Sequence, residues 1–298
     1  MAASQIVGTT SQQRITPYIS VDMFKHHRRR GVQVDNLVPR GTPDEQDAAL
    51  AEIIESASVW IDNLILQVLA ATQDTVLERV NVNRRGYATI HPRYRPVIAL
   101  TSFACGPTPN TLQTYADLTG CGVEPNRITV PTQPWGLTTS QGPLQFGAVA
   151  APMDQAWIQY TYQNGYPVTT LTAPVAAGAT SLPLADTTGI VAGQTQLTVY
   201  DLQRRVRFTA GTVSTAPTGG VGTGPGTVVC PALPYALPNS GNYPTMVSAL
   251  PPDVIEACVL VIRAMIKETG GSNPENQDAG EDYIEAEAVM HPYLVPVE

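Results

Sequence analysis

LPPDVIEACVLVIRAMIK, residues 250–267, predicts a helix at the centre of the fold. Two consecutive prolines suit the entry of a helix, because proline fixes φ and has no N–H to donate. Asp253 places a negative charge at the positive end of the helix dipole. Between Val254 and Ile266 only two residues are charged or polar, Glu256 and Arg263.

The apolar surface of this predicted helix covers a wide arc and has to be covered on more than one side. The helix is too short to cross a bilayer, which takes about 20 apolar residues. No membrane partner is therefore expected. The helix belongs either to the centre of a domain core or to both a core and a subunit interface. The residues concerned are Val254, Ile255, Cys258, Val259, Ile262 and Ile266.

Composition favours an α+β fold with many turns. The chain has 298 residues, room for one large domain or two small ones. Only 14% of its residues are charged, against about 25% in an ordinary soluble domain. Its 24 glycines and 26 prolines favour short strands joined by turns, with helices confined to particular segments.

The net charge of −8 is concentrated near the C-terminus. Residues 268–298 contain eight acids and no Lys or Arg, which leaves 17 acids against 17 bases in the rest of the chain. Affinity binders of nucleic acid show a basic face. A neutral body with an acidic end argues against that class of protein.

The four cysteines form no C-x-x-C pair, and Cys258 is expected to be a small core residue. A disulfide between Cys105 and Cys121 stays open. The N-terminus has no basic segment followed by an apolar run, so no secretory signal is expected. We expect the protein to be made in a reducing cytoplasm.

Residues 1–17 are expected to form a flexible N-terminal arm. A short helix over Ser20–Arg30 follows, and a cationic last turn before Gly31 is typical of a helix end. These cations either complement the helix dipole on a solvated face or contact DNA or an acidic partner. The candidates for such a contact are Lys25, Arg28, Arg29 and Arg30.

Thr42 begins the longest predicted helix. Pro43 at the first helical position and Glu45 at the third make a T-x-x-E capping box. Apolar residues from Leu50 to Val68 then repeat at helical spacing. Strands are predicted over 76–82, 87–90, 96–105, 127–130 and 156–167.

The remaining segments lack helical patterning. Residues 106–150 are expected to form a long irregular loop. Asn164-Gly165 predicts a tight hairpin turn. Residues 168–243 predict an inserted β module, a small barrel or sandwich. The core would then comprise 18–167 and 244–270.

Residues 271–298 predict an acidic C-terminal tail with a short helix over 282–290. Such a tail is either disordered or a docking peptide that orders on a partner. Docking is favoured here because the tail carries apolar anchors: Tyr283, Ile284, Tyr293, Leu294 and Val295.

No catalytic motif is present. The chain lacks H-E-x-x-H, G-x-S-x-G and P-loop patterns. The histidines His26 and His27 are adjacent, and His91 and His291 each precede a proline, so no metal-ligand spacing arises. We expect no enzyme activity, no metal and no cofactor.

The order of these pieces resembles the head-to-tail adaptor (connector) proteins of long-tailed bacteriophages. That family has a short helix, a long helix, a "tYxxGY" strand and a "lPpdl..A" helix. The matching residues here are Tyr160, Thr161, Tyr162, Gly165, Tyr166, Leu250, Pro251, Pro252, Asp253 and Ala257. The resemblance covers roughly residues 18–105, 156–170 and 248–270. It leaves out the segment 106–150 and the β module.

The resemblance implies a virion structural protein at the head–tail interface. Subunits of the family form a dodecameric ring below the portal protein, continue the channel for passing double-stranded DNA, and seat a neck stopper or tail terminator. The family's C-terminal segment docks on the portal, which matches the anchored tail. The inserted module would project toward the major capsid protein or other neck proteins.

Two other classes of function compete with the adaptor. A neck stopper or a baseplate component that binds the host surface would have a β-dominated core, against which the two long helices argue. A soluble enzyme or regulatory binding module would have a pocket with converging polar groups. No residue cluster of that kind is visible.

Overall fold

The computed structural model describes residues 16–27, 32–83, 86–132, 155–202, 204–215, 221–239, 244–268 and 279–294. Helices and antiparallel sheets occur together, which confirms the α+β class. The chain divides into two compact units, one within 72–165 and the other within 13–71 and 166–298. It therefore passes between the units at 71–72 and again at 165–166. Within the described ranges, no helix has the length and apolarity that crossing a membrane requires.

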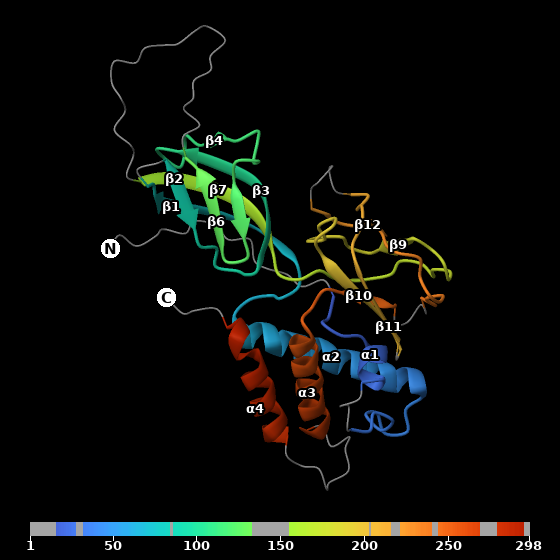
Figure 1. Cartoon of the computed structure of the whole chain (residues 1–298). Helices are drawn as coiled ribbons and strands as arrows, with labels where there is room; N and C mark the ends of the chain where they lie inside the picture. The colour runs from blue at the N-terminus through green and yellow to red at the C-terminus, as the bar shows by residue number, and fades with distance from the viewer. Residues whose placement is uncertain are drawn as a thin grey trace, which may run out of the picture. The chain divides into compact units, whose positions relative to one another are not determined.

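Two antiparallel sheets share one core in the first unit (Figure 1). The strand orders are β1-β7-β3-β4 and β2-β6-β5. Buried side chains of both sheets form the core, among them Phe103, Tyr160 and Ile128. The strands are β1 (Thr72–Asn81), β2 (Tyr87–Ile90), β3 (Val97–Gly106), β4 (Gln113–Thr114), β5 (Gly122–Glu124), β6 (Arg127–Pro131) and β7 (Gln155–Asn164).

The segment predicted as an irregular loop contains three of these strands, β4, β5 and β6. The sequence predicted only the last of them. The two it missed are two and three residues long, too short to show an alternating pattern. Residues 133–154 lie outside the described part. All four cysteines are free thiols, so the disulfide between Cys105 and Cys121 is not formed.

The hairpin predicted at Asn164-Gly165 is wrong. Gly165 does have the positive φ of such a turn, 88°. However, β7 pairs with β1 and β3, and the next strand, β8 (Val168–Thr170), belongs to a sheet of the second unit. The reason lies in Tyr166: its N–H donates to the Leu69 carbonyl (2.7 Å), and its carbonyl accepts from the Ala71 N–H (2.8 Å). The turn leads the chain into the second unit.

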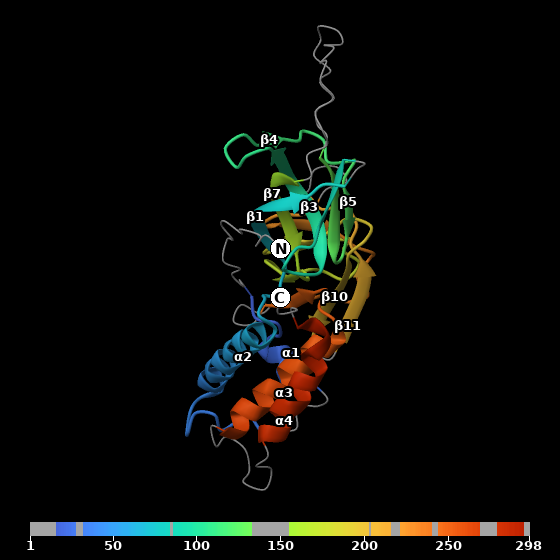
Figure 2. The ribbon, with the colours of Figure 1, turned by 90° about the vertical axis from the view of Figure 1, so that its left-hand side faces the viewer.

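The helices of the second unit pack around one apolar core (Figures 1 and 2). The first helix is shorter than the predicted Ser20–Arg30 and ends before His26, whose φ and ψ of −99° and 3° are not helical. Ser20 caps its start by accepting from the Met23 N–H. The helices are α1 (Val21–Lys25), α2 (Pro43–Ile65), α3 (Pro252–Glu268) and α4 (Ala279–Met290), followed by the short 3-10 helix η2 (His291–Tyr293).

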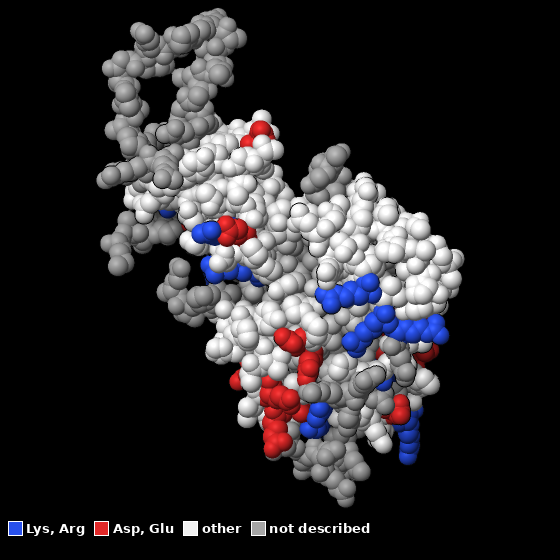
Figure 3. Space-filling view, viewed as in Figure 1, with Lys and Arg blue, Asp and Glu red and all other residues white. Residues whose placement is uncertain are grey.

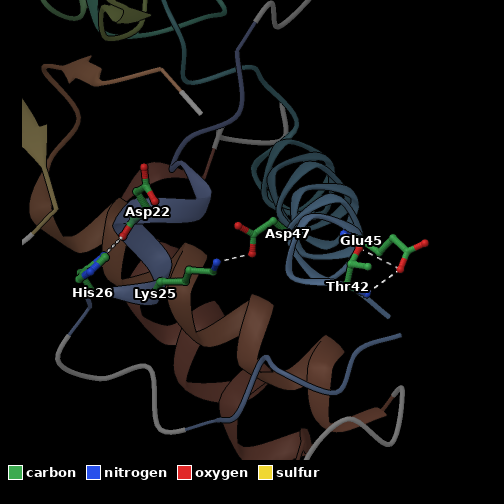
Figure 4. A network of polar contacts seen from close by, with 6 residues as sticks. All are labelled: Asp22, Lys25, His26, Thr42, Glu45 and Asp47. Carbon is green, nitrogen blue, oxygen red and sulfur yellow. Dashed lines mark hydrogen bonds and ion pairs between the residues drawn. The ribbon is translucent and has the colours of Figure 1, made fainter. Parts of the chain in front are cut away.

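The capping box predicted at the start of α2 is confirmed (Figure 4). The Glu45 N–H donates to the Thr42 hydroxyl at 3.4 Å, and the Thr42 N–H donates to the Glu45 carboxylate at 2.6 Å. The hydrogen bond from the Thr42 backbone lowers the pKa of Glu45. The helix ends at Ile65, and the next residue, Leu66, has a left-handed φ of 59°.

Replacing Thr42 with Ala is expected to lower the free energy of unfolding by about 0.5–2 kcal/mol, because the first turn of α2 loses its cap. Urea unfolding followed by circular dichroism measures the change. Ser56→Ala is the matched control on the same helix, since that hydroxyl donates to the Glu52 carbonyl within its own turn. Equal stability of Thr42→Ala and Ser56→Ala would show that the cap contributes nothing.

The β part of the second unit has two sheets with a common core, ordered β11-β10-β13-β8 and β12-β9. No closed barrel forms among the described strands, which leaves the sandwich alternative. The strand β13 lies beyond the predicted module boundary at 243. That 168–243 is an independent insert stays a prediction. The strands after β8 are β9 (Ser181–Leu184), β10 (Gln196–Asp201), β11 (Arg204–Thr209), β12 (Gly226–Val229) and β13 (Met246–Ser248).

Candidate interaction surfaces

The candidate functional sites in this structure are charged and apolar surfaces that could bind a partner. Among the described residues, no group of three His, Cys, Asp or Glu side chains is placed to hold a metal ion. The candidate surfaces all lie in the second unit. They comprise the face of α3, the helix α4, the end of α1, the strand β11 and the outer ridge of α2.

Of the two placements expected for α3, the structure shows the helix buried in the core of its own chain. All six of its predicted core or interface residues are buried within the chain itself. Both α2 and α4 pack against α3, and the figures show α3 and α4 side by side (Figures 1 and 2). The segment interpreted as a tail therefore supplies the missing cover. Burial of α3 needs no second subunit.

A buried carboxylate joins α4 to α3. Asp282 is only 4% exposed, and its two oxygens lie 3.0 Å from Arg263 Nη2 and 2.8 Å from Lys267 Nζ. The two cations are four residues apart on α3, so they lie on one face of the helix. One anion is thus shared by two cations in a largely desolvated place. This contact fixes the position of α4 on α3.

Of the predicted docking anchors, Tyr283 turns toward its own chain. Its ring centroid lies 5.4 Å from that of Trp60 in α2, and its hydroxyl donates to the Glu268 carboxylate at 3.3 Å. Burial, together with the nearby negative charge of Glu268, raises the pKa of Tyr283 to about 12. The phenol therefore stays protonated, as this hydrogen bond requires, throughout the physiological pH range.

The other anchors differ in exposure. Ile284 is 69% exposed and Leu294 is 41% exposed, whereas Tyr293 is partly buried against the helical core. Val295 lies outside the described residues. The helix α4, which Asp282 holds against α3, thus carries the exposed side chain of Ile284. The exposed side chain of Leu294 lies just after the helix.

Of the four cations near α1 that were predicted to contact DNA or an acidic partner, the structure describes only Lys25, and that side chain is paired within its own chain. Lys25 forms an ion pair with Asp47 of α2 (Figure 4). His26 Nδ1 lies 2.9 Å from the Asp22 carbonyl oxygen, and burial raises the pKa of the Asp22 carboxyl. Arg28, Arg29 and Arg30 lie outside the described residues. Lys25 helps to hold α1 against α2.

A cationic strip on β11 escaped the sequence analysis. Arg204, Arg205 and Arg207 are exposed on this strand, which is at the edge of its sheet. Figure 3 shows arginines gathered on the β part of the second unit and acids gathered over α4. The available signal was their concentration: residues 168–243 contain five charged residues, and three of them are these arginines.

The outer ridge of α2 combines acids with exposed apolar side chains. Glu52, Glu55 and Val59 lie on one stripe of the helix, Leu66 follows directly after its end, and all four are exposed. Val59 is 45% and Leu66 53% exposed. The helix contains six acids and no Lys or Arg. The ridge is therefore negative along its N-terminal half and apolar toward its C-terminal end.

No family model and no curated protein matches the chain. Among solved structures, a chain from the neck of an empty GTA particle, computed with C6 symmetry, matches at 16% sequence identity and a TM-score of 0.29. The match covers 53% of this chain and 71% of that chain. A similarity at this level identifies no family.

Proposed function

We propose that this protein is a structural subunit of the connector between the head and tail of a long-tailed bacteriophage. In this proposal, copies assemble as a ring below the portal protein and continue the channel through which DNA passes. A neck stopper or tail terminator follows below. The protein works in the virion and catalyses no reaction.

The residues that carry the family resemblance have defined structural positions. Pro252 begins α3, and Pro251 lies just before it with its carbonyl accepting the Val254 N–H at 3.1 Å. Tyr160 and Tyr162 are buried in the core of the first unit. Gly165 supplies a positive φ where the chain changes unit. These positions support the resemblance because each has a physical reason for its residue type.

The observation that carries the proposal is the fixed helix α4 with apolar side chains exposed on and after it. Asp282 fixes the helix, so Ile284 is presented at a set position without further ordering of the helix. A surface that is ordered before binding loses less conformational entropy when a partner docks. Apolar Ile284 and Leu294 suit a docking contact with the portal, as the family's C-terminal segment makes.

Portal docking is tested with the full chain and the portal protein encoded in the same genome, by co-sedimentation. Replacing Ile284 and Leu294 together with Asp is expected to weaken portal binding at least tenfold, because burying an aliphatic side chain is worth about 1.5–3 kcal/mol. Val229→Asp is the matched control, since Val229 is similarly exposed on β12. Undiminished binding by the double variant, or no binding by the wild type, would contradict the proposal.

A further inference from the structure

The arginines of β11 are held in place by uncharged groups. The Arg204 guanidinium lies 4.9 Å from the ring centroid of Tyr235, and that of Arg205 lies 5.4 Å from the ring centroid of Tyr200. Arg207 donates to the Gln196 side chain. Cations stacked on aromatic faces keep their full charge while losing mobility. Successive side chains of a strand point to opposite faces of the sheet, so Arg205 and Arg207 share one face and Arg204 lies on the other. The strip is thus pre-ordered positive charge on both faces of an edge strand.

This strip has no anionic partner in the described part of the chain. No ion pair there includes any of the three arginines, although Asp201 lies opposite Arg204 in the strand register. Beside them, Leu202 at the turn between β10 and β11 is 51% exposed. The surface therefore combines an apolar side chain with cations, along an edge strand whose outer side is unpaired by other described strands.

The outer ridge of α2 has the complementary composition. It exposes the carboxylates of Glu52 and Glu55, the latter also engaged within its own chain, together with Val59 and Leu66. The two surfaces also agree in length: residues 202–208 extend about 20 Å as a strand, and residues 52–66 extend about 21 Å as a helix. No ion pair joins the two surfaces within one copy among the described residues.

We infer that β11 of one copy binds the α2 ridge of a second copy. Complementary surfaces at different places on one unit give a heterologous contact, which repeats from copy to copy and closes into a ring when the rotation permits. The inference rests on the ring in the proposed function and names the surfaces that build it. DNA is a weaker fit for the arginines, because three charges neutralise few phosphates and a channel has to release its DNA.

The test uses charge reversal in the full chain, with mass measured by light scattering over a range of protein concentrations. Arg205→Glu with Arg207→Glu, and separately Glu52→Arg with Glu55→Arg, are each expected to weaken self-association at least tenfold. Combining all four substitutions in one chain is expected to restore it. Arg79→Glu is the control, since Arg79 is exposed on β1 of the first unit. Circular dichroism checks that each variant is folded.

Four outcomes overturn the inference. In the first, the wild type stays monomeric at every concentration; in the second, neither charge reversal affects self-association. In the third, the combined chain shows no recovery. In the fourth, the arginine variant loses binding to duplex DNA while its self-association is unchanged. Arg205→Lys with Arg207→Lys should retain association if positive charge is what matters. Portal binding is measured in a separate experiment. If the chain self-associates through these surfaces but does not bind the portal, the proposed function is wrong and the inferred contact between copies still holds.

Discussion

Replacing Asp282 with Asn is expected to lower the free energy of unfolding by about 3–5 kcal/mol, the usual cost of removing one partner from a buried ion pair. The reason is that Arg263 and Lys267 would both keep their charges in a largely desolvated place and lose the buried carboxylate that each contacts. The contact between α3 and α4 should weaken most, because this carboxylate joins them. The loss of helical circular dichroism signal in urea measures the change.

Glu281→Gln is the matched control, because Glu281 is the exposed neighbour of Asp282 on the same helix. A second variant separates charge from packing: Asp282→Leu combined with Arg263→Met and Lys267→Met should recover much of the stability, since apolar groups of similar volume often replace a buried ion cluster without loss. A loss below about 1 kcal/mol in Asp282→Asn would mean that the pair is no better than a surface ion pair.

Replacing Ile262 with Ala is expected to destabilise the isolated subunit by about 2–5 kcal/mol, because the deletion leaves a cavity among well-packed neighbours. Ile262 is fully buried within its own chain, on the helix that the sequence analysis assigned either to the core or to a subunit interface. Thermal unfolding of the subunit at several concentrations measures the effect. The loss should not depend on concentration, since subunit contacts would make the melting temperature concentration-dependent.

Val229→Ala is the control for this prediction, because Val229 is exposed on β12 and leaves no cavity. Should Ile262→Ala leave the subunit's stability unchanged but abolish its assembly, α3 would be an interface helix after all.

Local patterns in the sequence predicted the elements well. The T-x-x-E box placed the start of α2 at Pro43, and the double proline placed α3, because capping and proline geometry involve only neighbouring residues. Alternation likewise predicted the strands over 76–82 and 156–167, which overlap β1 and β7. The cover of α3 could not be predicted in this way. It depends on Asp282 meeting Arg263 and Lys267, a match between segments that no local pattern encodes.

The interaction surfaces were less predictable for the same reason. Asn164-Gly165 correctly indicated a positive φ at Gly165 but not that the next strand belongs to another sheet. The arginines of β11 follow one another in the sequence. Their significance depends on Tyr200 and Tyr235, which stack on Arg205 and Arg204, and on the strand being at an edge.

The second unit is encoded in two parts that flank the first, and this sets an order of events on the ribosome. Translation delivers α1 and α2 first, then the strands of the first unit, and α3 and α4 only after them. The nascent Leu50, Ile54 and Ile61 cannot bury themselves against α3 before it has been synthesised. Until then the apolar face of α2 is uncovered and open to chaperones, whereas the strands of 72–165 can complete their own sheets meanwhile.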